Sequence, residues 1–305
     1  MFFICSTVVI GSAIFFLWAM QPENFRREKA LIQGFLFESF QEDSYNAASL
    51  ILVDRENDSG FISKREREQR VPASLAKLFV VEYAASMVDL DCLVTPSPEA
   101  IALTKPGSSV AGIETREYAF RDLLAAMLVP SGNDAAYAVA DYCGGLLAPE
   151  AAPGQERVEV FMENLNRRLK EAGYTDTVLY DPSGFDTDAL TSALDLKSVT
   201  DVLLEYQWFR DMVSQSYYTT ELPDGGIYTW KNTNAFLDPE SEYYNGNVEG
   251  IKTGSLFDDF NLVVLYRQYG KEFLICSLGS ESDSSRYDDV SNIIRTIDES
   301  SFLAE

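Results

Sequence analysis

The sequence predicts a mixed α/β fold of the α+β type, in which an antiparallel sheet of about five strands is flanked by helices and carries a helical subdomain. Three observations predict it. Extended apolar segments lie early in the chain and return in its last third. Helical patterns fill the region between them, and one more helical pattern follows the last strands. This order fits a single sheet that is built from both ends of the chain.

The first half of the chain is expected to hold a β-hairpin and then helices. The hairpin is predicted at 47–68, because residues 57–60 (Asn-Asp-Ser-Gly) are turn-forming and lie between two extended runs. A helix is expected from about Ala73 to Val88. Three further helical segments follow, at 120–128, 134–143 and 156–173.

The last third of the chain is expected to return to strands. Strand-like segments lie at 226–230, 247–254, 260–268 and 271–279. The last two are predicted to form a hairpin around residues 269–271. A final amphipathic helix is predicted from apolar residues at i, i+3, i+4 and i+7 spacing, which are Val290, Ile293, Ile294 and Ile297.

The composition excludes several functional classes. There are 48 acidic and 24 basic residues, a formal net charge of −24, and no basic run offsets it. Because phosphate binding needs clustered Lys and Arg, nucleic acid is not an expected partner. The chain contains no histidine, so neither a Ser-His-Asp triad nor a His-ligated metal site can be built. We expect no metal and no cofactor, and any hydroxyl nucleophile must be activated by Lys, a carboxylate or a terminal amine.

The four cysteines, Cys5, Cys92, Cys143 and Cys276, form no CxxC pair. A zinc knuckle or thioredoxin-type site is therefore not predicted. Cys143 and Cys276 fall in apolar segments, where buried free thiols are expected. One disulfide remains open from the sequence.

The N-terminal segment is predicted to meet the membrane. Residues 2–20 carry no charge over 19 positions, which as a helix span about 28 Å. We expect 1–22 to be an uncleaved transmembrane anchor rather than a cleaved signal segment, 23–44 to be a polar connector, and 45–300 to be the folded domain. Arg26, Arg27 and Lys29 follow the span, which by the positive-inside tendency places the domain in the cytoplasm.

Three short motifs can carry chemistry. The first is Ser74-Leu75-Ala76-Lys77, at the start of the helix predicted from residue 73. Residues at i and i+3 share one face of a helix, so the Lys77 amine can reach the Ser74 hydroxyl. The helix N-terminus stabilises an oxyanion and lowers the pKa of a nearby amine, which favours Lys77 as a base.

The second motif is Ser131-Gly132-Asn133, in a turn between two predicted helices. Ser131 can relay a proton and Asn133 can bind a substrate amide, although Ser and Asn are also common helix caps. The third is Lys252-Thr253-Gly254, predicted to end or interrupt a strand. Gly254 lets a substrate backbone approach, while Lys252 and Thr253 can hold a carboxylate.

The three motifs occur in the order S-x-x-K, S-x-N and K-T-G, which is the order in penicillin-binding proteins and class A β-lactamases. From about residue 45 to 282 the sequence resembles the low-molecular-mass penicillin-binding proteins, specifically the D-alanyl-D-alanine carboxypeptidase family of serine peptidases. The resemblance is carried by the segments around the three motifs and by the segments 161–186, 229–237 and 271–282. The resemblance implies a β-lactamase/D,D-peptidase-like catalytic domain outside the cytoplasm, against the charge bias at the N-terminus.

The resemblance also implies residue roles. Ser74 would be acylated by the penultimate D-Ala of a peptidoglycan stem peptide, or by a β-lactam antibiotic, with Lys77 moving the proton. Ser131 and Asn133 would complete the proton relay and the amide contacts. The other expected site residues are Lys252 and Thr253 on the substrate carboxylate, Gly254 beside it, and Ser255, whose N–H joins that of Ser74 in an oxyanion hole.

The sequence departs from the family in two places. Residues 189–195 lack the histidine of the family's His-x-Ser-Thr-Ala-x-Asp stretch. After K-T-G the family continues x-Thr-x-x-Ala-Gly, whereas this chain has 255–260 as Ser-Leu-Phe-Asp-Asp-Phe. We expect Leu256, Asp258 and Asp259 to alter how the carboxylate is held.

Four alternatives stay open from the sequence. A D,D-endopeptidase shares all three motifs. A β-lactamase needs a second base, and only Glu163, with Asn166 three residues on, resembles the class A acid. A muropeptide- or β-lactam-binding protein without activity would fit the changes after Lys252. A membrane-anchored acidic interaction protein would require the motifs to be coincidental.

Overall fold

The computed structural model describes residues 42–300. The predicted anchor at 1–22 and nearly all of the connector at 23–44 lie outside the described residues. Within 42–300, none of the helices combines the length and the apolar character that a membrane span requires.

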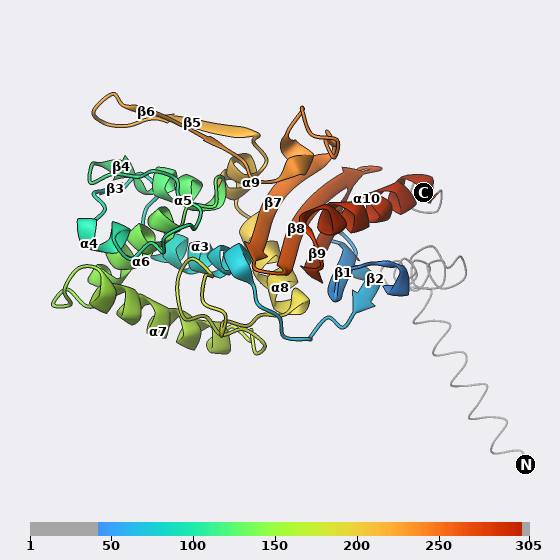
Figure 1. Cartoon of the computed structure of the whole chain (residues 1–305), viewed down its shortest axis with the longest axis horizontal. Coiled ribbons are helices and arrows are strands. Elements are labelled where there is room, and N and C mark those ends of the chain that lie inside the picture. The colour runs from blue at the N-terminus through green and yellow to red at the C-terminus, as the bar shows by residue number, and fades with distance from the viewer. Residues whose placement is uncertain (1–41, 301–305) are drawn as a thin grey trace, which may run out of the picture.

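The central element is a five-stranded antiparallel sheet in the order β2-β1-β9-β8-β7 (Figure 1). Both ends of the chain contribute to it, as predicted. Its strands are β1 (Ser49–Asp54), β2 (Ser59–Lys64), β7 (Val248–Leu256), β8 (Asp259–Gln268) and β9 (Lys271–Ser280). The two predicted hairpins, β1–β2 and β8–β9, are confirmed. The sheet leaves β7 as an edge strand, so half of its backbone polar groups point away from the sheet.

Alternating side chains divide the sheet into two apolar faces. Leu52, Val264 and Ile275 pack with the final helix α10 (Asp283–Glu299), whose predicted stripe is buried. Val53 and Val263 belong to the larger core on the other face. The helices in contact with that face are α8 (Ala193–Leu204) and α9 (Gln207–Val213).

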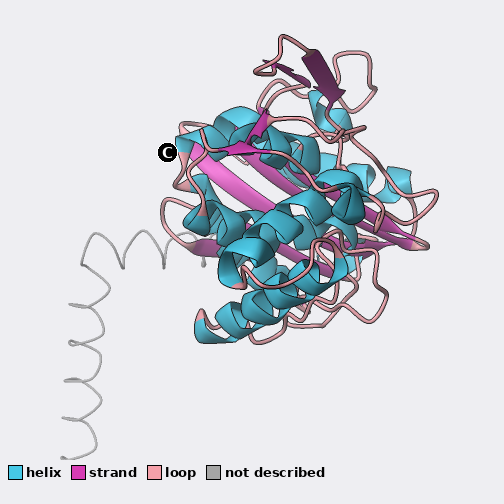
Figure 2. Cartoon of the chain, turned by 90° about the vertical axis from the view of Figure 1, so that its left-hand side faces the viewer, coloured by secondary structure: helices cyan, strands magenta, loops and turns pink. Residues whose placement is uncertain are grey.

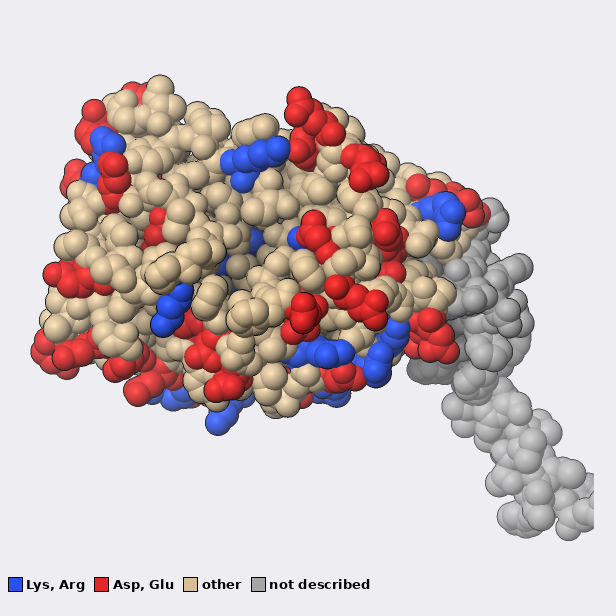
Figure 3. Space-filling model, in the orientation of Figure 1, with Lys and Arg blue, Asp and Glu red and all other residues tan. Residues whose placement is uncertain are grey.

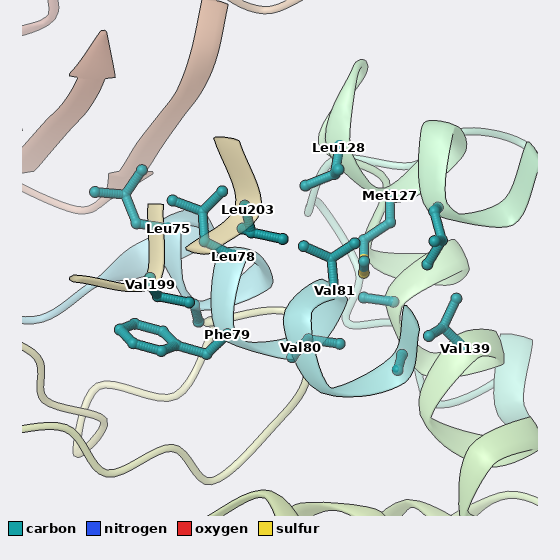
Figure 4. Close-up of a cluster of buried hydrophobic side chains, with 14 of the residues drawn as sticks. Leu75, Leu78, Phe79, Val80, Val81, Met127, Leu128, Val139, Val199 and Leu203 are labelled. Atoms are coloured by element: carbon teal, nitrogen blue, oxygen red, sulfur yellow. The ribbon is translucent and has the colours of Figure 1, made fainter. Parts of the chain in front are cut away.

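The helical subdomain lies beside the sheet (Figures 1 and 2). Its helices are α3 (Ala76–Met87), the short α4 (Pro98–Ile101), α5 (Phe120–Leu128), α6 (Asn133–Leu147) and α7 (Gln155–Glu171). Helix α3 is buried around most of its circumference, as expected for a helix inside a core. Figure 4 shows its side chains beside those of Met127, Val139 and Leu203 from three other helices. This packing fixes the position of the first motif.

The remaining elements are short. Two separate ribbons pair β3 (Leu93–Val94) with β4 (Tyr118–Ala119) and β5 (Tyr217–Glu221) with β6 (Ile227–Lys231). The 3-10 turns are η1 (Glu42–Ser44), η2 (Ala73–Leu75) and η3 (Ala235–Leu237). The strand predicted at 226–230 therefore forms, but it pairs with β5 away from the main sheet.

Two further sequence expectations can be compared with the structure. Cys143 and Cys276 are buried free thiols, as predicted, and Cys92 is also free, so the disulfide that the sequence left open does not form within 42–300. The third motif was expected to end or interrupt a strand, and this was wrong. Residues 252–254 lie inside β7, whose pairing with β8 continues to Leu256.

Candidate active site

The first motif forms a hydrogen-bonded pair at the junction of η2 and α3. Lys77 Nζ lies 2.9 Å from Ser74 Oγ, 2.8 Å from Asn133 Oδ1 and 2.8 Å from the Ser183 carbonyl. The Lys77 side chain is fully buried, whereas Ser74 is half-buried. The predicted contact between Ser74 and Lys77 is thus present, and the same amine joins the second motif to the first.

Burial is the main cause of the lowered pKa of the Lys77 amine. Removal of the amine from water lowers its pKa from 10.5 to about 7, although Asp181 and Asp134 act to raise it. The sequence analysis attributed the lowered pKa of Lys77 to the helix N-terminus, whereas the main cause in the structure is burial. An amine with a pKa near 7 is half neutral at neutral pH and can accept the proton of Ser74.

A loop after α7 holds the third partner of Lys77 in place. The Asp181 carboxylate accepts backbone N–H bonds from Ser183 at 2.7 Å, Gly184 at 2.9 Å and Asp186 at 2.7 Å. Gly184 has a φ of +78°, and a Cβ there would lie 1.9 Å from the Ala73 carbonyl. Only glycine allows this approach, which sets the Ser183 carbonyl on the Lys77 amine.

The second motif lies in the turn between α5 and α6, as predicted. Asn133 is buried and its amide oxygen accepts from Lys77. Ser131 is buried with a φ of +63°, a conformation that a non-glycine residue adopts rarely and that is often found at functional sites. Its hydroxyl makes no hydrogen bond to Ser74 or Lys77 in the described part of the chain. The relay role of Ser131 stays a prediction.

The third motif lies on edge strand β7. Lys252 is fully buried and donates to the Thr253 carbonyl at 3.1 Å, while the Thr253 and Thr233 hydroxyls are 2.6 Å apart. Burial lowers the pKa of Lys252 well below its ordinary value, and the positive charges of Lys77 and Arg286 lower it further. An anion that binds here would relieve this repulsion.

Gly254 has a structural role that the sequence analysis did not predict, and its role in the approach of a substrate backbone stays a prediction. A Cβ at this position would lie 2.8 Å from the Pro72 carbonyl and 3.2 Å from Leu75 Cγ. The glycine therefore lets β7 pack directly against the turn that holds Ser74, which brings the first and third motifs together.

Arg286 is a site residue that the sequence analysis missed. Its Nη1 donates to Ser255 Oγ at 2.9 Å and to the Gly254 carbonyl at 3.0 Å, and its guanidinium lies 5.1 Å from the centre of the Tyr287 ring. The residue is 5% exposed and adds positive charge behind β7. The one signal in the sequence was a basic residue in the first turn of a helix, where the helix dipole disfavours it.

A small pocket of about 130 Å³ lies beside the motifs, and of the predicted site residues only Ser74, Asn133 and Ser255 are among those that line it. Ser74, Asn133, Ser183, Ser255 and Leu256 are among its lining residues. Figure 3 shows a recess near the middle of this face with basic atoms visible inside it. The geometry suits a substrate whose carbonyl approaches Ser74 while a carboxylate lies toward the basic side chains.

The carboxylates considered in the sequence analysis lie outside this pocket. Glu163 is exposed on α7, and Asp258 and Asp259 lie at the β7–β8 turn. Of the described residues, no Asp or Glu lines the pocket, and no cluster of three or more His, Cys, Asp or Glu side chains could hold a metal ion. The expected effect of Asp258 and Asp259 on the carboxylate site stays a prediction.

Comparisons with known proteins identify the class of protein that this fold and this site define. The family described as D-alanyl-D-alanine carboxypeptidase, peptidase family S11, matches residues 37–264. The chain belongs to this family. The family and enzyme class predicted from the sequence, a serine-type D-alanyl-D-alanine carboxypeptidase, are thereby confirmed.

Individual relatives support the assignment. The chain is 29% identical over 281 residues to D-alanyl-D-alanine carboxypeptidase DacD of Escherichia coli, with 87% of this chain and 67% of the relative covered. It is 24% identical over 220 residues to DacF of Bacillus subtilis, with 70% and 52% covered. The chain thus spans between about half and two thirds of the length of these two relatives.

Solved structures confirm the predicted fold. The Streptomyces K15 DD-transpeptidase has a TM-score of 0.72 at 24% identity, with 84% of this chain and 98% of that chain covered. Penicillin-binding protein D2 of Listeria monocytogenes, solved in a cefotaxime-bound form, has a TM-score of 0.66 at 20% identity, with 83% and 97% covered.

Proposed function

We propose that this chain removes the C-terminal D-alanine from peptidoglycan stem peptides through an acyl-enzyme on Ser74. The observation that carries the proposal is the buried Lys77 amine, 2.9 Å from Ser74 Oγ and with a pKa lowered to about 7. In a chain without histidine, this amine is a base that can activate a serine at neutral pH.

Acylation begins when neutral Lys77 takes the proton of Ser74 and Oγ attacks the carbonyl of the penultimate D-Ala. The N–H groups of Ser74 and Ser255 hold the oxyanion. The C–N bond then breaks, and the Lys77 proton passes, through Ser131 if the relay operates, to the amine of the departing D-Ala. In the second half, water attacks the ester, Lys77 accepts its proton, and that proton returns to Ser74 as the acid product leaves.

Positive charge behind β7 supports the preference for a free carboxylate. Lys252 and Thr253 on β7 would hold the terminal carboxylate, and Arg286 donates to Ser255 Oγ on the same strand. Burial, and then the charges of Lys77 and Arg286, lower the pKa of Lys252, and the opposite charge of a bound carboxylate would favour its charged form. A substrate that ends in a carboxylate is therefore favoured over an internal peptide bond.

β-Lactam antibiotics are the second expected ligand. They would acylate Ser74 in the same pocket, and since none of its described lining residues is a carboxylate, the adduct lacks a second base for rapid hydrolysis. Slow release of the drug distinguishes this proposal from the β-lactamase alternative.

From the substrate class we infer that the domain lies outside the cytoplasm, and residues 1–22 would be its membrane anchor. A reporter enzyme fused after Glu305 tests this placement. Activity only on the outer side of the membrane supports it, and activity inside the cell contradicts it.

The activity itself is tested by release of D-Ala from Nα-acetyl-L-Lys-D-Ala-D-Ala. The wild-type protein should release one D-Ala per peptide, and the Ser74→Ala variant should release none. Absence of release by a folded wild-type protein would overturn the proposal in favour of a binding role.

A further inference from the structure

Two amines of the active site are buried without a carboxylate partner. Over residues 42–300, neither Lys77 nor Lys252 takes part in an ion pair. A buried charge that lacks a partner is costly. Lys77 must nevertheless become positively charged during the reaction, when it takes the proton of Ser74. Other groups near this amine must therefore favour its charged form.

Asp181 holds one of the hydrogen-bond acceptors of the Lys77 amine. Its Oδ1 accepts from the backbone N–H of Ser183 at 2.7 Å and of Gly184 at 2.9 Å, and its Oδ2 accepts from that of Asp186 at 2.7 Å. These bonds close the loop around the carboxylate. The Ser183 carbonyl, which belongs to this loop, lies 2.8 Å from Lys77 Nζ. Asp181 thus fixes an acceptor on the amine and adds a negative charge behind it.

Asp134 does the same for a second acceptor of the amine. It is buried in the first turn of α6 and directly follows Asn133, whose Oδ1 lies 2.8 Å from Lys77 Nζ. The Asp134 carboxylate accepts from the backbone N–H groups of residues 111–113 at 2.8, 2.8 and 3.1 Å. A second carboxylate that is bound by backbone N–H groups therefore lies behind a second acceptor of the same amine.

The loop that Asp134 holds also belongs to the catalytic pocket. Residues 107–109 line this pocket together with Ser74. The Ser109 carbonyl accepts from the Asn133 backbone N–H at 2.9 Å, which ties the loop to the second motif. The hydrogen bonds of Asp134 thus fix both one wall of the pocket and the turn that carries Asn133.

Both carboxylates also act on Lys77 through their charge. Burial lowers the pKa of this amine to about 7, and Asp181 and then Asp134 act in the opposite direction. Within 42–300, neither aspartate forms an ion pair with another side chain, so no cation cancels its charge at close range. The two turns that fix the acceptors of Lys77 therefore also favour its protonated form.

The other ionisable groups around Lys77 cannot supply this negative charge. Lys252 of β7 is an amine, and Arg286 of α10, which acts on Lys252, is a cation. Tyr137 of α6 interacts with the Ser183 side chain, and burial raises the pKa of this phenol to about 12, so it is neutral at the pH of the reaction. In the described part of the chain, the acidic groups that act on Lys77 are thus Asp134 and Asp181.

We propose that Asp134 and Asp181 are a pair of positioning residues that hold the two fixed acceptors of the Lys77 amine and balance the positive charge that this amine acquires. The inference rests on the proposed carboxypeptidase function and deepens it, because it names the groups that control the base. Over residues 42–300, neither carboxylate forms a hydrogen bond to Ser74 or Lys77, so both act through the turns that they hold and through their charge.

The test is the rate of acylation of the full chain by benzylpenicillin between pH 5.5 and 9, in Asp181→Asn and in Asp134→Asn. Loss of either negative charge disfavours the protonated amine, so the midpoint of the pH profile should fall, and it should fall further in Asp181→Asn. A fall of about one pH unit raises the neutral fraction at pH 6 from about 9% to about 50%. Asp181→Asn should therefore be acylated about fivefold faster than the wild type at pH 6 and at an equal rate at pH 8.

An alanine variant separates the charge from the hold on the loop. Asp181→Ala should shift the midpoint as the asparagine variant does, but it should also lower the rate at pH 8 by about tenfold, because the Ser183 carbonyl is no longer fixed. Asparagine keeps an acceptor oxygen and should restore that rate. Asp188→Asn is the matched control, because Asp188 is an exposed acid of the same loop whose side chain forms no hydrogen bond or ion pair with residues 42–300, and it should change neither quantity.

A second measurement does not depend on catalysis. The ε-carbon of Lys77 is titrated by NMR in protein labelled with [ε-13C]lysine, with Lys77→Arg to assign the signal, and each variant is first shown to be folded by urea unfolding. The titration midpoint of Lys77 should be lower in both asparagine variants. A purely structural role of the aspartates would leave it unchanged.

The outcomes separate this inference from the proposed function. If the wild type is acylated and the midpoint stays at the same pH in both asparagine variants, the assignment of the two aspartates is wrong while the activity stands. If the folded wild type is acylated at no pH, the proposed function itself fails. An equal midpoint shift in Asp188→Asn would also overturn the assignment, because any charge of the loop would then have the same effect.

Discussion

The pKa of Lys77 leads to a quantitative prediction about pH. If neutral Lys77 is the base and its pKa is about 7, the rate of acylation should follow the fraction of neutral amine. That fraction is about 9% at pH 6 and about 91% at pH 8, so the rate should rise roughly tenfold and then level off. A lysine with its ordinary pKa of 10.5 would be less than about 0.1% neutral at pH 7, and the rate would keep rising by about tenfold per pH unit beyond pH 9.

The assay is the second-order rate constant for acylation by benzylpenicillin between pH 5.5 and 9, followed by intact-protein mass. Lys77→Arg is the matched control, because arginine keeps the positive charge but does not lose its proton in this range, and it should give no measurable adduct. A rate that continues to climb through pH 9 would refute the lowered pKa. A rate that is independent of pH in the wild type would refute Lys77 as the base.

Three further predictions concern the surroundings of the site and the fold. Arg286→Gln should raise KM for peptides with a free C-terminal carboxylate by about tenfold and leave kcat nearly unchanged, because the charge-assisted hydrogen bond from Arg286 to Ser255 is lost. An unchanged KM in a steady-state assay of D-Ala release would rule out this role. Gly254→Ala should lower the free energy of unfolding in urea by about 1–3 kcal/mol and slow acylation, because the added Cβ would lie 2.8 Å from the Pro72 carbonyl, just before Ser74. Gly60→Ala is the control, because the added Cβ meets open space there, and it should change neither quantity. Glu272 forms an ion pair with Arg210 at 2.7 Å, and its pKa is lowered from 4.5 to about 2 although burial acts to raise it. The ionised Glu272 therefore stabilises the folded protein fully above about pH 4.5, and this contribution is lost as the pH falls toward 2. Glu272→Gln should therefore cost about 2 kcal/mol at pH 7 and remove much of the difference in stability between pH 5 and pH 3 in urea unfolding, and equal stability of the two proteins at pH 7 would contradict this account.

Local patterns predicted most of the sheet and the order of its helices. Turn-forming residues at 57–60 and around Gly270 identified the two hairpins, because these residues tolerate the backbone conformations that tight turns require. The spacing of the apolar residues in the final helix identified the side that packs on the sheet. Period and turn chemistry are local properties, and a sequence shows them directly.

The local part of the site was also predictable. Ser74 and Lys77 are three residues apart at a helix start, and this spacing alone brings the hydroxyl and the amine together. The order of the three motifs indicated that Asn133 and the strand at 252–254 would lie close to Ser74 and Lys77. The contact between Ser74 and Lys77 needed only residue types and spacing, whereas the joining of the other two motifs was implied by the resemblance to the family.

Contacts between distant segments were not predictable in the same way. Arg286 reaches β7 because α10 packs on the sheet, and no local pattern gives that contact. The role of Gly254 depends on how closely β7 approaches the turn before α3, and the pKa of Lys77 depends on burial that the whole core produces.

The most direct test of the central claim is the mass of the protein after brief exposure to benzylpenicillin, with the modified residue located by peptide mapping. The account predicts a long-lived adduct of one drug per chain on Ser74 in the wild type and none in Ser74→Ala. An adduct on another residue, or no adduct on a folded wild-type protein, would contradict the claim that Ser74 is the nucleophile of a penicillin-sensitive D,D-peptidase.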